Sequence, residues 1–245
     1  MNTDAYLRAL KSNVILLVVL IAVYALLITG SITLDASPHG AIEVDVVFVF
    51  DTTGSMQNKI DSLLGYSSDF ARELDMSGAD YRLAMVCFRT FEEPPVVRET
   101  FPPSDNLADF QNFLSDLRAD GGGREAQPDA IRYALDEFTY RENAHRILIL
   151  VTDEGLLGDE SFAPYGYNVD VIERDFDEAS AQWDDLVDEI IDGGFTAYSV
   201  TVPDDHFVTM ADQTGGTFYN VLANRDFTSI LQDLVQDIKS RILTE

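Results

Sequence analysis

The segment that decides the fold is Asp45–Met56, with the sequence DVVFVFDTTGSM. Its apolar run, Val46–Phe50, is typical of a central parallel strand that is buried on both faces. The run stops at Asp51, a short polar loop follows, and apolar residues then recur at helical spacing between positions 60 and 70. The sequence therefore predicts a central strand that opens through a polar loop into a helix.

The loop after this strand carries oxygen donors at alternate positions, namely Asp51, Thr53 and Ser55. Open α/β sheets bind their ligands at the carboxyl ends of such strands. Carboxylates and hydroxyls are hard donors that suit Mg²⁺, Mn²⁺ or Ca²⁺. The loop thus predicts a divalent-cation site. Taken alone, it also allows a helix N-cap, in which the hydroxyl of Thr53 or Ser55 bonds free backbone N–H groups.

Downstream of this helix, apolar runs that predict strands alternate with amphipathic patterns that predict helices. The expected strands are 81–88, 96–101, 145–151, 195–202 and 217–221. Because only a tight turn precedes 96–101, this strand is expected to pair antiparallel at an edge. The alternation predicts an α/β fold with a doubly wound, mostly parallel, Rossmann-like sheet and one antiparallel edge strand. The 145–151 strand ends in Thr152-Asp153, which places a second acid at a carboxyl end.

Four segments, in this order, resemble the von Willebrand factor A (vWA) domain family. They are FDTTGSM at 50–56, GGGRE at 121–125, VTD at 151–153 and TMADQTGGTFY at 209–219. The first is similar to the D-x-[ST]-x-S motif of the family's metal-ion-dependent adhesion site (MIDAS), in a prokaryotic or matrix-protein form. The resemblance covers about residues 42–243 and implies a vWA-like domain over 42–245.

The resemblance also implies a role for each polar residue of the loop. Thr53 and Ser55 would be hydroxyl ligands, while Asp51 and Asp153 would bind the ion directly or through water. The implied ion is Mg²⁺, with Mn²⁺ or Ca²⁺ as alternatives. An acidic side chain of a protein partner would complete the coordination.

The glycine-rich loop departs from the family pattern, in which it usually supplies a threonine ligand. Here Arg124 stands at about that place, and Glu125 next to it is the substitute ligand that we include in the metal site. A bound Glu125 would add a third negative charge, weaken attraction for an external carboxylate and favour Ca²⁺ or Mn²⁺ over Mg²⁺. The alternatives are that Glu125 is a helix-start carboxylate favoured by the helix dipole, and that Arg124 is a solvated charge or binds a partner's carboxylate.

The N-terminal part is expected to be a short tail (1–12), a transmembrane signal anchor (13–34) and a linker (35–41). No charged side chain occurs from Ser12 to Leu34, and about 20 such residues span a bilayer as a helix. Basic residues precede the segment and acidic ones follow it, which favours a single-pass protein with a cytoplasmic N-terminus and an extracytoplasmic domain. A cleaved signal peptide is the alternative.

The charge of the chain excludes one class of function. With 43 acidic and 16 basic residues, the net charge is −27, which repels a phosphate backbone and argues against nucleic-acid binding. Such an acidic surface, with only three lysines, resembles proteins of salt-loving prokaryotes and remains soluble where salt screens its self-repulsion. The single Cys87 excludes an intrachain disulfide and lies in an apolar run.

The function that we expect is therefore binding, not catalysis. A membrane-anchored vWA domain would hold a divalent cation and recognise a protein partner. The first alternative is a structural component of a membrane assembly, in which the metal stabilises the fold. The second is a phosphatase similar to haloacid dehalogenases with Asp51 as nucleophile, but that chemistry usually needs an Asp where Thr53 stands and a Lys before the later acidic strand end.

Overall fold

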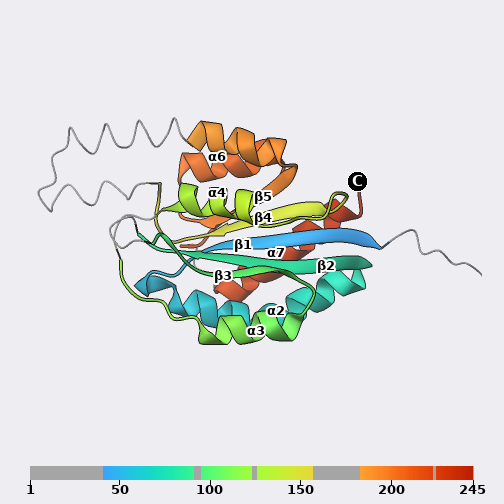
Figure 1. Ribbon diagram of the computed structural model, residues 1–245, viewed down its shortest axis with the longest axis horizontal. Coiled ribbons are helices and arrows are strands. Elements are labelled where there is room, and N and C mark those ends of the chain that lie inside the picture. The colour runs from blue at the N-terminus through green and yellow to red at the C-terminus, as the bar shows by residue number, and fades with distance from the viewer. Residues whose placement is uncertain (1–40, 91–94, 123–125, 157–182, 223–224, 245) are drawn as a thin grey trace, which may run out of the picture. The chain divides into compact units, whose positions relative to one another are not determined.

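The sheet at the centre of the molecule has the order β3-β2-β1-β4-β5-β6 (Figure 1). The computed structural model describes residues 41–90, 95–122, 126–156, 183–222 and 225–244. The strands within these ranges are β1 (Ile42–Asp51), β2 (Ala79–Phe88), β3 (Val97–Ser104), β4 (His145–Val151), β5 (Phe195–Thr201) and β6 (Phe218–Asn220). All neighbouring strands pair in parallel except β2 and β3, which pair antiparallel. The expected mostly parallel sheet with one antiparallel edge strand is confirmed.

Helices cover both faces of this sheet (Figure 1). One face packs against α2 (Gln57–Met76), α3 (Leu107–Asp116) and α7 (Phe227–Ile242). The other face packs against α4 (Gln127–Glu137), α6 (Asp205–Thr214) and the helical residues 183–192. The fold is therefore a three-layer, doubly wound α/β structure.

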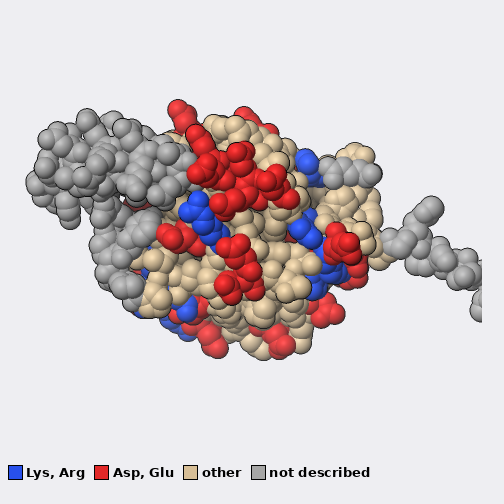
Figure 2. Space-filling view, turned by 45° about the horizontal axis from the view of Figure 1, so that its top comes forward, with Lys and Arg blue, Asp and Glu red and all other residues tan. Residues whose placement is uncertain are grey.

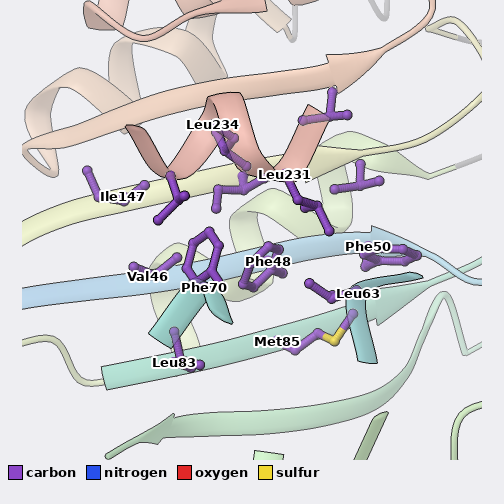
Figure 3. Close-up of a cluster of buried hydrophobic side chains, with 14 of the residues drawn as sticks. Val46, Phe48, Phe50, Leu63, Phe70, Leu83, Met85, Ile147, Leu231 and Leu234 are labelled. Carbon is purple, nitrogen blue, oxygen red and sulfur yellow. The ribbon is translucent and has the colours of Figure 1, made fainter. Parts of the chain in front are cut away.

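Strand β1 is buried on both faces because its side chains alternate between two hydrophobic clusters. Val46, Phe48 and Phe50 point toward α2 and α7, where Phe70, Leu63, Leu231 and Leu234 meet them (Figure 3). Val47 and Val49 point into the opposite cluster. Fully burying a side chain of this size contributes about 1.5–3 kcal/mol, so the strand anchors both layers and fixes the position of its own carboxyl end.

The TMADQTGGTFY segment connects α6 to β6 and has a packing role. Gly215 ends α6 with a left-handed φ of 76°, which suits glycine. Gly216 lies so close to β5 that a Cβ there would stand 1.9 Å from the Ala197 carbonyl oxygen. The Thr214 hydroxyl accepts a hydrogen bond from the Ala197 N–H at 2.9 Å. The Thr-Gly-Gly sequence therefore docks this turn onto the sheet.

Element ends differ from the sequence-based expectation by a few residues. Strand β1 begins at Ile42, four residues before the apolar run, and β3 extends to Ser104 through two prolines. An edge strand tolerates proline because one side of its ladder carries no partner, and the β2–β3 register shifts twice along its length.

Several expectations concern residues outside the described ranges. These are the tail 1–12, the transmembrane anchor 13–34, most of the linker 35–41, Arg124 and Glu125. Among the residues that are described, no helix is both long and apolar enough to cross a bilayer.

Candidate metal centre

Polar residues gather where β1 and β4 end, at the carboxyl ends of the central strands, on the left in Figure 1. This end of the sheet is called the edge below. The register pairs Phe50 of β1 with Val151 of β4, so Asp51 and Thr152 follow side by side. This register brings together two segments that are about a hundred residues apart in sequence. The edge is the carboxyl edge, where open α/β sheets bind ligands.

Asp51 is fully buried, and each of its carboxylate oxygens accepts a hydrogen bond. Its Oδ1 accepts a hydrogen bond from the Thr53 N–H at 2.7 Å, and its Oδ2 accepts one from the Thr152 hydroxyl at 3.0 Å. These bonds fix the plane of the carboxylate. A carboxylate held at the carboxyl end of a central strand is a candidate cation ligand, because Mg²⁺ and similar ions bind carboxylate oxygens.

Ser55 and Asp153 face each other across the same edge. The Ser55 hydroxyl donates to Asp153 Oδ1 at 2.9 Å, although 98 residues separate the two in sequence. Ser55 lies in a short 3-10 helix, η1 (Gly54–Met56), directly before α2. Two hard oxygen donors therefore meet near the buried Asp51, as a site for Mg²⁺ or a similar ion requires.

The alternative N-cap role of the loop is not what the structure shows. Thr53 occupies the N-cap position of η1 without a side-chain capping bond, and α2 likewise begins at Met56 without one. The Ser55 hydroxyl bonds a carboxylate on another strand end instead of a backbone N–H. In the described residues, neither hydroxyl makes the N-terminal capping bond that the loop sequence allows.

Lys59 belongs to this edge, and sequence reasoning missed it. Its Nζ lies 2.8 Å from Asp153 Oδ2, and the two side chains are 16% and 13% exposed. Lys59 follows Ser55 by four residues, which places both on one face of the helix start. That spacing, together with the scarcity of lysine in the chain, was the signal available in the sequence.

The glycine-rich loop also reaches the edge. Gly121 O accepts from the Gly54 N–H at 3.2 Å, and Thr52 O accepts from the Asp120 N–H at 3.1 Å. A Cβ on Gly54 would stand 3.2 Å from Gly121 O, so glycine permits this close approach. Arg89, at the end of β2, forms an ion pair with Asp120 and adds a second tie to the loop. The loop is therefore anchored directly beside the DTTGS segment.

Four of the five predicted metal ligands thus lie at one edge: Asp51, Thr53, Ser55 and Asp153. The fifth, Glu125, lies outside the described residues, so its role stays a prediction. No group of three or more His, Cys, Asp or Glu side chains is arranged around a common metal position in the described ranges. The donor set that does converge is a mixture of carboxylates and hydroxyls, and its chemistry fits a hard divalent cation.

A doubly wound sheet with this DTTGS edge defines the vWA class, and a family comparison agrees. The pattern of the family described as von Willebrand factor type A domain matches residues 45–237. The chain therefore belongs to the von Willebrand factor type A domain family.

Solved structures of similar fold include two named proteins. An aerotolerance-related membrane protein from Bacteroides fragilis is 14% identical, with a TM-score of 0.53 over 80% of this chain and 99% of that one. Proximal thread matrix protein 1 (PTMP1) from the mussel byssus, described with a zinc-occupied MIDAS motif, is 17% identical. Its TM-score is 0.56 over 82% of this chain and 46% of the PTMP1 chain. At these identities the likeness shows the fold.

One curated relative matches part of the chain. Alpha-protein kinase vwkA of Dictyostelium discoideum is 27% identical over 124 residues. The match covers 48% of this chain but only 19% of the kinase. The chain therefore spans under a fifth of that relative's length.

Proposed function

We propose that this domain binds a divalent cation at the DTTGS edge and uses it to recognise a protein partner. The observation that carries the proposal is the convergence of the Ser55 hydroxyl and the Asp153 carboxylate, at 2.9 Å, beside the buried Asp51. Membership of the vWA family supports it, and so does the structural neighbour whose MIDAS motif holds zinc. We expect Mg²⁺ as the usual ion, with Mn²⁺ or Ca²⁺ as alternatives.

In this proposal the polar residues of the edge hold the ion in different ways. Ser55 and Thr53 would hold the ion through their hydroxyls, while Asp51 and Asp153 hold it directly or through water. A bound cation would supply an electron-poor centre that attracts a carboxylate. An acidic side chain of the partner would complete the coordination of the ion.

The surface charge sets conditions on that partner. Figure 2 shows acidic side chains over much of this face, with several groups of basic ones between them, and the whole chain has 43 acidic against 16 basic residues. Long-range electrostatics would therefore oppose an acidic partner at low salt. We infer that the contact depends on the metal at short range, and that salt strengthens the encounter by screening the repulsion.

We further propose that the domain is attached to a membrane by residues 13–34 and faces the extracytoplasmic side. The apolar, uncharged composition of this segment supports the proposal. A structural neighbour named as a membrane protein is consistent with it. Membrane fractionation of the full chain, followed by protease treatment of intact cells, tests both the attachment and the side.

Replacing Ser55 by alanine tests the metal site. We expect Ser55→Ala to reduce Mg²⁺ affinity about tenfold or more, because a ligand that touches the ion contributes at least as much as an outer-shell group. Isothermal titration calorimetry on the full chain measures this. The matched control is Ser62→Ala, since the Ser62 hydroxyl lies on the same helix and donates to Asn58 O at 2.8 Å instead of to a proposed ligand. Equal Mg²⁺ affinity in both variants would contradict the proposed site.

A structural role in a membrane assembly is the second candidate, with the metal stabilising the fold. Melting with Mg²⁺ or EDTA, combined with a pull-down in both conditions, separates the two. Partner capture that needs Mg²⁺ supports the binding role. A large thermal shift together with Mg²⁺-independent capture supports the structural role.

A further inference from the structure

The Asp153 carboxylate has its two oxygens engaged by different groups. Oδ1 accepts from the Ser55 hydroxyl at 2.9 Å, and Oδ2 lies 2.8 Å from Lys59 Nζ. We propose that Lys59 sets the cation preference of the site, because it occupies Oδ2 and so leaves Asp153 a single oxygen for the metal. This inference rests on the proposed metal site and adds a selectivity residue to it.

Coordination chemistry links that arrangement to the choice of ion. Ca²⁺ takes 6–8 oxygens at 2.3–2.6 Å and commonly binds carboxylates through both oxygens. Mg²⁺ demands an octahedral set at 2.0–2.1 Å, keeps waters and uses one carboxylate oxygen at a time. Because the Lys59 ammonium group holds Oδ2, Asp153 can bind Mg²⁺ through its single remaining oxygen. It cannot bind Ca²⁺ through both oxygens. Lys59 therefore favours Mg²⁺, or Mn²⁺ as a similar six-coordinate ion, over Ca²⁺.

The charge of Lys59 acts in the same direction. Both members of the pair are mostly buried, at 16% and 13% exposure, so solvent screens their interaction less than on an open surface. Lys59 offsets the charge of Asp153, the carboxylate that it contacts. Since ligand charge is one of the factors that tune Ca²⁺ affinity, this offset lowers the attraction for an ion that needs many anionic oxygens.

Lys59 is held in place by the helix that carries it. Its neighbour Ile60 is 1% exposed and packs into the core, as does Leu63. Two residues earlier, Gln57 Oε1 accepts from the Ala119 N–H at 2.9 Å, which ties the start of α2 to the segment before the glycines. The first turn of α2 therefore cannot swing away without breaking contacts on both sides, so Lys59 remains beside Asp153.

This role opposes the effect expected of Glu125. A third carboxylate from the glycine-rich loop would favour Ca²⁺ or Mn²⁺, whereas the Lys59 ammonium withdraws an oxygen and a charge from the same site. The ion preference of the site is thus a balance between Lys59 on helix α2 and Glu125 in the glycine-rich loop. Of these two residues, Lys59 is the one whose position the structure describes.

The test is the ratio of Mg²⁺ to Ca²⁺ affinity in the full chain, measured by calorimetry with each chloride salt. Lys59→Met keeps the length of the side chain but frees Asp153 Oδ2. We expect the ratio to move about tenfold or more toward Ca²⁺, since ligand number and charge tune Ca²⁺ affinity over decades. Lys59→Gln, which is polar but uncharged, is expected to move the ratio in the same direction and serves if the methionine variant does not fold.

The matched control is Lys239→Met, which removes a comparable ion pair far from the edge. Lys239 Nζ lies 2.5 Å from Glu73 Oε2, and these side chains are 18% and 21% exposed. We expect this variant to keep the wild-type ratio. A ratio that stays within a factor of about two in folded Lys59→Met and Lys59→Gln would overturn the selectivity role, even if both ions bind more weakly. If wild type binds neither ion, the metal site itself is refuted together with this inference.

Discussion

Strand β1 carries a buried aspartate near each end, and the protein treats the two in opposite ways. Toward the amino end, Asp45 is 1% exposed and its Oδ1 receives hydrogen bonds at 2.9 Å from the Nε atoms of Arg82 and Arg141. At the carboxyl end, Asp51 is equally buried but is oriented by the Thr53 N–H and the Thr152 hydroxyl.

The two carboxylates differ in the groups that hold them. Two guanidinium groups compensate the charge of Asp45 within the fold, and they also tie the strand to the segment before β4, because the Arg141 N–H donates to Asp45 Oδ2 at 2.8 Å. A backbone N–H and a hydroxyl donate to Asp51 at the carboxyl end of the same strand. Its place at that end is why we propose it as a cation ligand.

The largest expected effect comes from removing the compensated carboxylate. Asp45→Ala leaves two arginines without their buried partner, and breaking such a pair costs about 3–5 kcal/mol of unfolding free energy. Urea denaturation followed by circular dichroism measures the loss. The matched control acts on the same arginine. Asp80 pairs with Arg141 at 3.0 Å but is 53% exposed, so Asp80→Ala should cost about 1 kcal/mol or less.

Equal losses of unfolding free energy in Asp45→Ala and Asp80→Ala would show that the buried ion pairs of Asp45 stabilise the protein no more than the exposed pair of Asp80. The Mg²⁺ affinity of the folded Asp45→Ala protein is a second check. We expect it to equal that of wild type, since Asp45 and Asp51 lie on different halves of β1.

The next effect concerns Asp51, where the substitution should cost metal binding instead of stability. Asp51→Asn preserves the shape, its amide oxygen can still accept from Thr53, and its NH₂ can donate to Thr152, so the metal-free protein should lose about 1 kcal/mol or less. Wild type should gain about 2.7 kcal/mol when Mg²⁺ is present at a hundred times its Kd. We expect the variant to lose this gain.

Denaturation with Mg²⁺ and with EDTA measures the gain in each protein. The matched control is Asp61→Asn, since Asp61 is an exposed residue of α2 whose carboxylate accepts from Gln57 at 2.9 Å. It should keep the full Mg²⁺ gain. Retention of that gain in Asp51→Asn would remove Asp51 from the ligand set.

The comparison also shows what the sequence can and cannot predict. The apolar run from Val46 to Phe50 sufficed to predict the buried central strand, because period and length follow from local chemistry. The same run placed Asp51 at a carboxyl end, and the Thr152-Asp153 pair after another apolar run followed by the same logic. The family resemblance implied that Asp51 and Asp153 hold one ion, and the pairing of β1 with β4 brings the ends of their strands together.

Polar contacts across the fold were harder to predict. Asp45 and Arg141 are 96 residues apart, and Lys59 and Asp153 are 94 apart. No periodicity connects such pairs, and each arginine or lysine taken alone resembles any solvated charge. Only the register of the sheet and the placement of the helix bring them together, which is why Lys59 was absent from the predicted site although it contacts one of its residues.

The smallest expected effect is a dependence on pH, which separates the two aspartates without removing the fold. Burial raises the pKa of Asp45, but the hydrogen bonds from Arg82 and Arg141 outweigh it and hold the pKa below the usual 3.8. A carboxyl whose pKa is lower in the folded state stabilises the protein above its unfolded pKa, and that stability is lost as the pH falls through the folded pKa. The unfolding free energy of wild type should therefore exceed that of Asp45→Asn by a constant margin above about pH 5, and the margin should shrink below about pH 4.

Urea denaturation of both proteins in EDTA across this range measures the margin. Because all other carboxylates are common to the two proteins, a margin that holds or widens on acidification would mean that the arginines do not stabilise the ionised form of Asp45.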